Sequence, residues 1–236
     1  MKKNWSLLNT VRGLTLLVVT SIAAAPAVAT DLKGNPGLLG SWEFASARLD
    51  ALPLWRDVLK RIQQERPRIL KCDQNIDTCS SPSMVAWRAK IKALQSQPLR
   101  QRVEAVNRFV NHWPKHTDQK AYGKADHWAS PLEFLERAGD DEDFAIMKFS
   151  TLREAGLKNE QLRLVMVRDS LSGRAQIILA AYIDDEILIL SDQWTNVIRD
   201  DHAMSYVPFI SLNETTRWAH VPISTTNAKT HEGNRQ

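Results

Sequence analysis

The chain has 236 residues and a formal net charge of +4, with 31 Lys or Arg residues against 27 Asp or Glu residues. Residues 1–29 have the pattern of a signal peptide: two lysines, the apolar run LTLLVV, and Ala-Val-Ala at 27–29 as a cleavage site. Cleavage would leave 28 basic against 27 acidic residues, without the basic excess of a nucleic-acid-binding protein. The apolar run is too short to span a membrane. We therefore expect an exported, periplasmic protein with no transmembrane span in the mature chain and no nucleic-acid partner.

The mature sequence is expected to form one compact domain over residues 40–223. Its N-terminal part, 30–125, is predominantly helical in pattern, the core occupies 126–223, and a polar tail follows at 224–236. Helices followed by a run of strands predict an α+β fold with an antiparallel sheet.

Three helices are predicted in the N-terminal part. The first covers 41–68, the second begins after Ser81 and ends at Pro98, and the third begins at Leu99 and stops before Pro114. Apolar side chains recur in them at helical spacing, which we interpret as core packing. In the first helix these are Trp55, Val58, Leu59 and Ile62.

The two cysteines, Cys72 and Cys79, lie close together between the first two helices. An exported protein with two such cysteines is expected to oxidise them to a disulfide. The alternative, a metal or redox pair, is disfavoured because the spacing is not C-x-x-C and no histidine is near. His112 and His116 are four residues apart, but Pro114 between them argues against a helical metal pair.

The stretch 126–157 is expected to hold two helices around which the core is organised. Ser130 caps the first, and Gly139 ends it. The second opens with four consecutive acids at 140–143 and is closed by Gly156. Acidic side chains at a helix N-terminus complement the helix dipole.

Beyond Gly156 the apolar pattern changes from a helical to a strand-like period. A tight hairpin is predicted at Asp184-Asp185, between two apolar runs. The predicted strands are 162–169, 175–183, 186–190, 204–212 and 217–223.

Several segments share the motifs of one family: VNRFVN (106–111), DHWASPLEFL (126–135), GDDEDFAIMKFSTLREAGL (139–157), LRLVMV (162–167) and the hairpin from Tyr182 to Gln193. In these motifs the chain resembles the bacterial transglutaminase-like cysteine peptidases, whose LapG-like members are periplasmic proteases that trim surface adhesins. The resemblance implies a papain/transglutaminase-like core. In such enzymes a cysteine at a helix N-terminus is the nucleophile, a histidine on a following strand is its base, and an aspartate on the next strand orients that histidine.

The resemblance places these three reacting positions at Asp141, Gln176 and Ser191, with Asp192 adjacent to the third. All three residues differ from the family pattern. A carboxylate is a poor substitute for a thiolate, and an amide cannot take or give a proton near neutral pH. We therefore expect no catalytic residue of the family's kind and little or no peptidase activity.

The resemblance also implies a calcium site on the acids that flank the nucleophile position, here Asp140, Glu142 and Asp143. Several carboxylates in one helical turn supply part of the oxygen-rich shell that calcium requires. The alternative is a solvated acidic helix start, and the sequence leaves both interpretations open.

Two classes of function remain. The first is a non-catalytic, exported homologue that binds a peptide or protein partner; the resemblance points to a surface adhesin or a membrane receptor. The second is an active periplasmic peptidase or acyltransferase that uses a non-standard site, with Ser191 or Asp192 taking part.

Overall fold

The computed structural model describes residues 37–223, so the expected signal peptide and polar tail lie outside the described residues. The described residues form an α+β domain with a seven-stranded antiparallel sheet in the order β1-β7-β6-β2-β3-β4-β5. The strands are β1 Ser41–Ser46, β2 Leu162–Asp169, β3 Ala175–Ile183, β4 Glu186–Leu190, β5 Ile198–Arg199, β6 Tyr206–Leu212 and β7 Arg217–Pro222. The α-helices are α1 Pro53–Gln74, α2 Pro82–Leu94, α3 Leu99–Val110, α4 Asp118–Ala121, α5 Pro131–Arg137 and α6 Asp141–Glu154.

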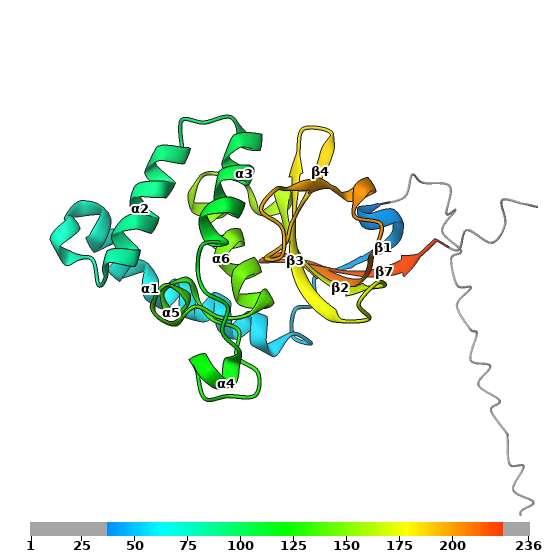
Figure 1. Ribbon diagram of the computed structural model, residues 1–236, viewed down its shortest axis with the longest axis horizontal. Coiled ribbons are helices and arrows are strands. Elements are labelled where there is room, and N and C mark those ends of the chain that lie inside the picture. The colour runs from blue at the N-terminus through cyan, green and yellow to red at the C-terminus, as the bar shows by residue number, and fades with distance from the viewer. Residues whose placement is uncertain (1–36, 224–236) are drawn as a thin grey trace, which may run out of the picture. The chain divides into compact units, whose positions relative to one another are not determined.

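The helices cover one face of the sheet, and α6 packs directly against β3 (Figure 1). Alternate residues of the paired strands β2 and β3 therefore enter two different hydrophobic clusters. Leu164 and Leu179 pack against the helices, whereas Val165 and Ile178 face a smaller cluster on the opposite side of the sheet. This arrangement buries α6 on nearly all sides, with every residue from Asp143 to Leu152 buried.

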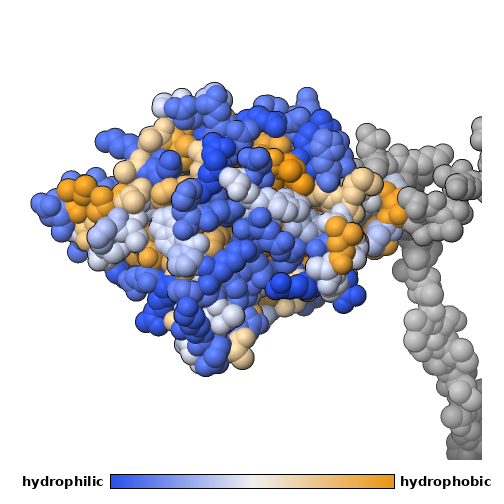
Figure 2. Space-filling model, viewed as in Figure 1, coloured by the Kyte–Doolittle hydropathy of each residue, from blue (hydrophilic) through white to orange (hydrophobic). Residues whose placement is uncertain are grey.

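The surface in Figure 2 is largely hydrophilic, with small apolar patches separated by polar ones. Large apolar side chains that are exposed include Ile76, Leu171 and Met204, which belong to different parts of the chain. Isolated exposed apolar residues of this kind are normal on the surface of a folded domain. No helix of residues 37–223 is long and apolar enough to cross a membrane.

The predicted strands 162–169, 175–183 and 186–190 are confirmed as β2, β3 and β4. The hairpin at Asp184-Asp185 is confirmed too, and Asp184 takes the positive φ of 52° that such a tight turn requires. The second and third predicted helices are confirmed as α2 and α3. The short elements α4 and β5 were not anticipated, since each lies within a polar stretch without a clear period.

The predicted helix over 41–68 is wrong at both ends. Residues Ser41–Ser46 form β1, which pairs antiparallel with β7, and the helix runs from Pro53 to Gln74. Pairing with a strand about 170 residues away overrides local propensity, and that partner cannot be seen in the local pattern. The helix also continues through Pro67.

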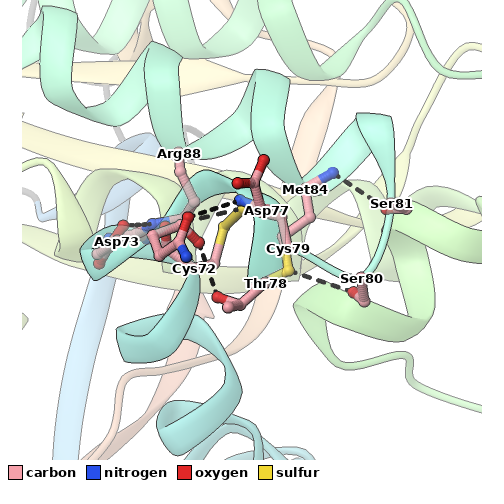
Figure 3. The surroundings of a disulfide bond; sticks show 10 residues. Cys72, Asp73, Asp77, Thr78, Cys79, Ser80, Ser81, Met84 and Arg88 are labelled. Atoms are coloured by element: carbon pink, nitrogen blue, oxygen red, sulfur yellow. Dashed lines mark hydrogen bonds and ion pairs between the residues drawn. A yellow bond between two sulfur atoms is a disulfide. The ribbon is translucent and has the colours of Figure 1, made fainter.

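Cys72 and Cys79 form a disulfide, as predicted, and the described residues include no free cysteine (Figure 3). Cys72 lies in the last turn of α1, and Cys79 follows a short 3-10 turn at Ile76–Thr78. The hydroxyl of Ser81 then accepts a hydrogen bond from Met84 N at 3.1 Å and caps α2. The disulfide therefore fixes the connection between the first two helices.

Candidate functional site

Helix α6 begins at Asp141, with its N-terminus beside the start of β3. The Asp141 carboxylate accepts a hydrogen bond from the backbone N–H of Ile177 at 2.5 Å (Oδ2 to N). Burial raises the pKa of the Asp141 carboxyl, the hydrogen bond from Ile177 opposes that shift, and the charge of Asp192 adds to it. The position predicted for a nucleophile therefore holds a half-buried carboxylate that is already hydrogen-bonded.

Asp141 lines a cleft of about 330 Å³ near the start of β3. The cleft brings together residues from the loop before α4, the start of α6, the start of β3 and the loop after β4. Its lining residues are Lys115, His116, Thr117, Asp140, Asp141, Arg174, Gln176, Asp192 and Gln193.

Gln176 lies in β3, and Ser191 directly follows β4, the strand paired with β3. The side-chain carbonyl of Gln176 accepts a hydrogen bond from Gln193 Nε2 at 2.7 Å. Ser191 is completely buried, its Oγ accepts from Gln193 N at 3.1 Å, and the Tyr206 phenol lies beside both side chains. The two positions predicted for the base and its orienting acid are therefore close together, but they hold an amide and an inaccessible hydroxyl.

Asp192, the neighbour of Ser191, lines the cleft whereas Ser191 does not. Its carboxylate forms an ion pair with Lys115 at 2.5 Å (Oδ2 to Nζ), and its side chain is only 6% exposed. A carboxylate that is held by a lysine in this way is not poised to activate a nucleophile.

A cluster of acids surrounds the α6 N-terminus, and one of its members, Asp140, also lines the cleft. One carboxylate oxygen from each of Asp118, Asp140 and Asp143 lies within 4.8 Å of the others. Glu142 forms a similar group with Asp118 and Asp126, and another with Asp140 and Asp141. Burial, reinforced by mutual repulsion, raises the pKa of Asp140 to about 6, of Asp143 to about 8 and of Glu142 to about 9.

Three oxygens of this cluster are buried without a hydrogen-bond partner: Asp118 Oδ1, Asp140 Oδ1 and Asp143 Oδ2. The second oxygens of Asp118 and Asp143 accept hydrogen bonds at 2.6 Å from the N–H groups of His127 and Ala129. Buried carboxylate oxygens without partners are costly unless a cation neutralises them. The donor set therefore fits a hard divalent cation such as calcium, which prefers oxygen ligands.

Comparison with known proteins identifies the family of this chain. The family model of the bacterial transglutaminase-like cysteine proteinases matches residues 69–226. The chain belongs to this family. None of the curated proteins matches it significantly.

Solved structures of LapG from Legionella pneumophila share the fold of this family member. One LapG structure has 28% sequence identity and a TM-score of 0.57, and the match covers 64% of this chain and 87% of LapG. A calcium-bound LapG matches with a TM-score of 0.58 over the same shares. An EGTA-treated LapG matches with a TM-score of 0.57, covering 84% of LapG.

Among the acids of this family member, sequence reasoning named Asp140, Glu142 and Asp143 but missed Asp118 and Asp126. Asp118 is the first residue of α4 and Asp126 lies between α4 and α5, so only the fold brings them to α6. These two acids were a weak signal, because acids are common in any solvated loop.

The role expected of Gly139 needs correction. Helix α5 ends at Arg137, and Ala138, not Gly139, takes the positive φ of 58°. A Cβ atom on residue 139 would lie 1.8 Å from Asp143 Oδ2. Glycine is therefore required at 139 because the Asp143 carboxylate approaches its backbone closely, whereas Gly156, with φ of 99°, closes α6 as predicted.

Proposed function

We propose that this protein is an exported, calcium-binding transglutaminase-like homologue without peptidase activity, which holds a peptide segment or a protein partner in the cleft around Asp141. One observation carries the proposal: the three reacting positions hold Asp141, Gln176 and Ser191, which supply neither a thiolate nor an imidazole. The family and the cleft are retained, so binding of an extended segment remains available to the fold.

The alternative hydrolase that uses Ser191 is disfavoured by burial, because a completely buried hydroxyl cannot reach a peptide carbonyl. Asp192 lines the cleft, but its side chain is almost fully buried and is paired with Lys115. Both cysteines of the described residues are in the disulfide at the end of α1. Loss of one triad member already lowers the rate by orders of magnitude.

Calcium binding is supported by the three buried, unpartnered oxygens of Asp118, Asp140 and Asp143. These residues would hold the ion, with Glu142 beside them, and calcium-bound LapG shares 28% identity with this chain. The ion would supply positive charge that offsets the repulsion among the acids at the start of α6. The acids themselves order the segment that contains His127 and Ala129 by accepting its N–H groups.

The test compares the natural protein with the triple variant Asp141→Cys, Gln176→His and Ser191→Asp on peptides from bacterial surface proteins, with calcium present. We expect no cleavage by the natural protein and cleavage by the variant that a thiol-directed inhibitor blocks. Binding of the same peptides to the natural protein is measured by fluorescence anisotropy. Cleavage by the natural protein that is abolished in Asp141→Ala would overturn the proposal, as would the absence of any peptide or protein binding.

A second candidate function rests on His116, which lines the same cleft as Asp141. His116 Nδ1 lies 3.0 Å from the carbonyl oxygen of Arg137, which can only accept, so Nδ1 carries the proton and Nε2 is the basic nitrogen. A base and a carboxyl in one cleft can activate water for hydrolysis. Hydrolysis of a p-nitrophenyl ester by the natural protein that falls at least 10-fold in His116→Ala would favour this function, and equal rates would exclude it.

A further inference from the structure

Residues 127–130 connect the acid cluster of α6 to the long helix α1. On one side of this segment, the N–H groups of His127 and Ala129 hold one oxygen each of Asp118 and Asp143, at 2.6 Å. The remaining oxygens of these two carboxylates are the ones without partners. The direction in which those free oxygens point therefore depends on where the backbone of this segment lies.

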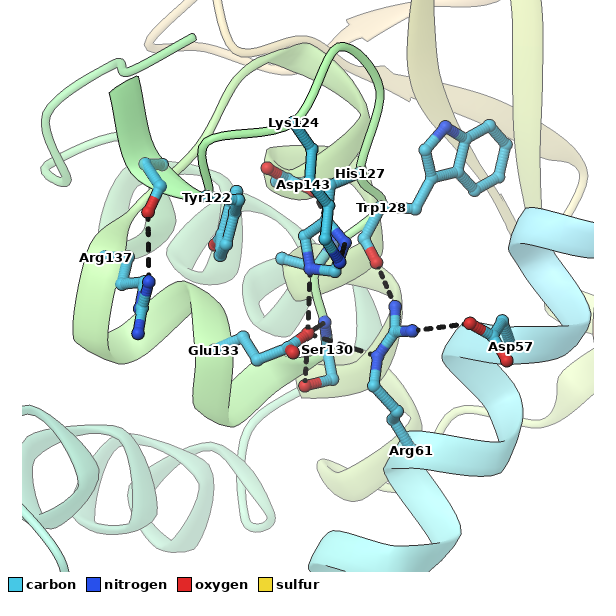
Figure 4. Close-up of polar contacts among 12 residues, drawn as sticks. Asp57, Arg61, Tyr122, Lys124, His127, Trp128, Ser130, Glu133, Arg137 and Asp143 are labelled. Carbon is cyan, nitrogen blue, oxygen red and sulfur yellow. Dashed lines mark hydrogen bonds and ion pairs between the residues drawn. The ribbon is translucent and has the colours of Figure 1, made fainter. Parts of the chain in front are cut away.

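The opposite side of the segment is held by α1 (Figure 4). The guanidinium of Arg61 donates a hydrogen bond to the carbonyl of Trp128 and pairs with Glu133 at 3.2 Å. Glu65, one turn further along α1, accepts hydrogen bonds from the hydroxyl of Ser130 and from Leu132 N, the latter at 3.3 Å. These contacts fix the segment from the face opposite to the acids.

Further contacts restrain residues 127–130 in addition to those made by α1. His127 Nε2 lies 3.3 Å from Glu133 Oε2, and the His127 ring packs on Tyr122 with 4.3 Å between centroids. Glu133 is thus shared by Arg61 and His127, so its position also depends on α1. Neither Arg61 nor Glu65 belongs to the groups of acids that could ligate a cation.

We infer that Arg61 and Glu65 are positioning residues for the cation site, acting through the backbone of residues 127–130. This inference rests on the calcium binding proposed above. Groups that orient metal ligands from outside the coordination shell commonly change metal affinity by about 10–100-fold when they are removed. The polar contacts of Arg61 and Glu65 therefore keep two carboxylates oriented before the ion binds.

The test measures calcium affinity by isothermal titration calorimetry in the full mature chain. Arg61→Met keeps most of the side-chain packing but removes the guanidinium, and we expect the Kd for calcium to rise about 10-fold. Arg68→Met is the matched control on α1, since Arg68 pairs only loosely with Glu136, at 3.9 Å, and both side chains are about half exposed. Its Kd should equal that of the natural protein.

Two further variants separate positioning from general stability. Arg61→Lys keeps a donor for the Trp128 carbonyl and should recover part of the affinity, and Glu65→Gln should weaken calcium binding less than Arg61→Met. A purely structural role would lower the calcium-free melting temperature of Arg61→Met and Glu65→Gln without changing Kd, which would overturn the inference. If Arg61→Met does not fold, an unchanged Kd in Glu65→Gln overturns it equally. If the natural protein binds no calcium, both this inference and the proposed calcium binding are overturned. If the natural protein binds calcium and the variants have the same Kd, the inference alone is overturned.

Discussion

The two sides of the α6 N-terminus carry acids in opposite states. On the cleft side, Asp141 accepts a hydrogen bond from Ile177, and Asp192 is paired with Lys115. In the acid cluster, Asp118, Asp143 and Asp140, which also lines the cleft, each keep a buried oxygen without a partner. The carboxylates of Asp141 and Asp192 thus have partners within the protein, whereas the acid cluster keeps buried oxygens that fit a cation.

The largest effect is expected from comparing two single substitutions, one in the acid cluster and one in the cleft. Asp143→Ala should abolish stabilisation by calcium, which amounts to about 2.7 kcal/mol at a calcium concentration 100 times the Kd. Asp141→Ala should retain most of it, because the Asp141 carboxylate is already hydrogen-bonded to Ile177 N and has no buried oxygen without a partner. Melting curves with calcium and with EGTA measure both variants. Equal calcium responses in the two variants would contradict the assignment of the cation to the Asp143 side.

The next largest effect is expected from Gly139→Ala. Its Cβ would lie 1.8 Å from Asp143 Oδ2, so the carboxylate or the backbone must move. Overpacking of this kind costs about 1–3 kcal/mol, and the displaced carboxylate should also weaken calcium binding. Gly173→Ala is the control, because a Cβ atom at residue 173 would have no neighbour within 4 Å. The φ of 71° at Gly173 makes alanine mildly unfavourable there. A Gly139→Ala variant with normal calcium affinity would show that Asp143 is not a ligand.

The cleft side of α6 also contains a buried group without a partner, but it is an amine. Lys148 is completely buried, and its Nζ has no hydrogen-bond partner. Burial lowers the pKa of Lys148 to about 7, while the charge of Asp192 opposes that shift and Lys115 adds to it. Lys148→Met should therefore stabilise the protein by about 1 kcal/mol at pH 7, since an unsatisfied buried donor is removed.

The pH dependence of that gain identifies its cause. Between pH 7 and the ordinary lysine pKa of 10.5, the unfolded chain binds a proton that the folded chain does not, so the natural protein gains stability from this group as pH rises. The advantage of Lys148→Met should be greatest at pH 7 and below, and should shrink by pH 9.5. Chemical denaturation at both pH values measures it, and a constant advantage would indicate a packing effect instead.

The smallest effect is expected from Asp141→Asn. The amide oxygen of asparagine can still accept from Ile177 N, so the local geometry should persist. Loss of a favourable charge at the helix N-terminus costs about 0.3–1 kcal/mol, and relief of burial and of repulsion from Asp192 offsets it. We expect stability within about 0.5 kcal/mol of the natural protein at pH 7, measured by denaturant titration. A loss of several kcal/mol would mean that the Asp141 charge holds the cleft together.

Much of this protein was determined by local sequence. The N-cap Ser81, the closing Gly156 and the apolar periods predicted α2, α3 and the strands β2 to β4, because caps and periodicity act over a few residues. The pairing of Cys72 with Cys79 followed from there being two cysteines close together. The assignment of the three reacting positions to Asp141, Gln176 and Ser191 rests on motif order and stays a prediction.

Other features were decided only by tertiary structure, since they depend on residues far apart in the chain. Strand β1 exists because β7 lies beside it, and Asp118 joins the acids of α6 because the segment before α5 folds back over that helix. The loop that follows β4 places Asp192 in the cleft and buries Ser191. Gly139 is required by the approach of Asp143 rather than by its own φ. Long-range packing sets each of these, and a local sequence pattern carries no signal of which distant group will be the neighbour.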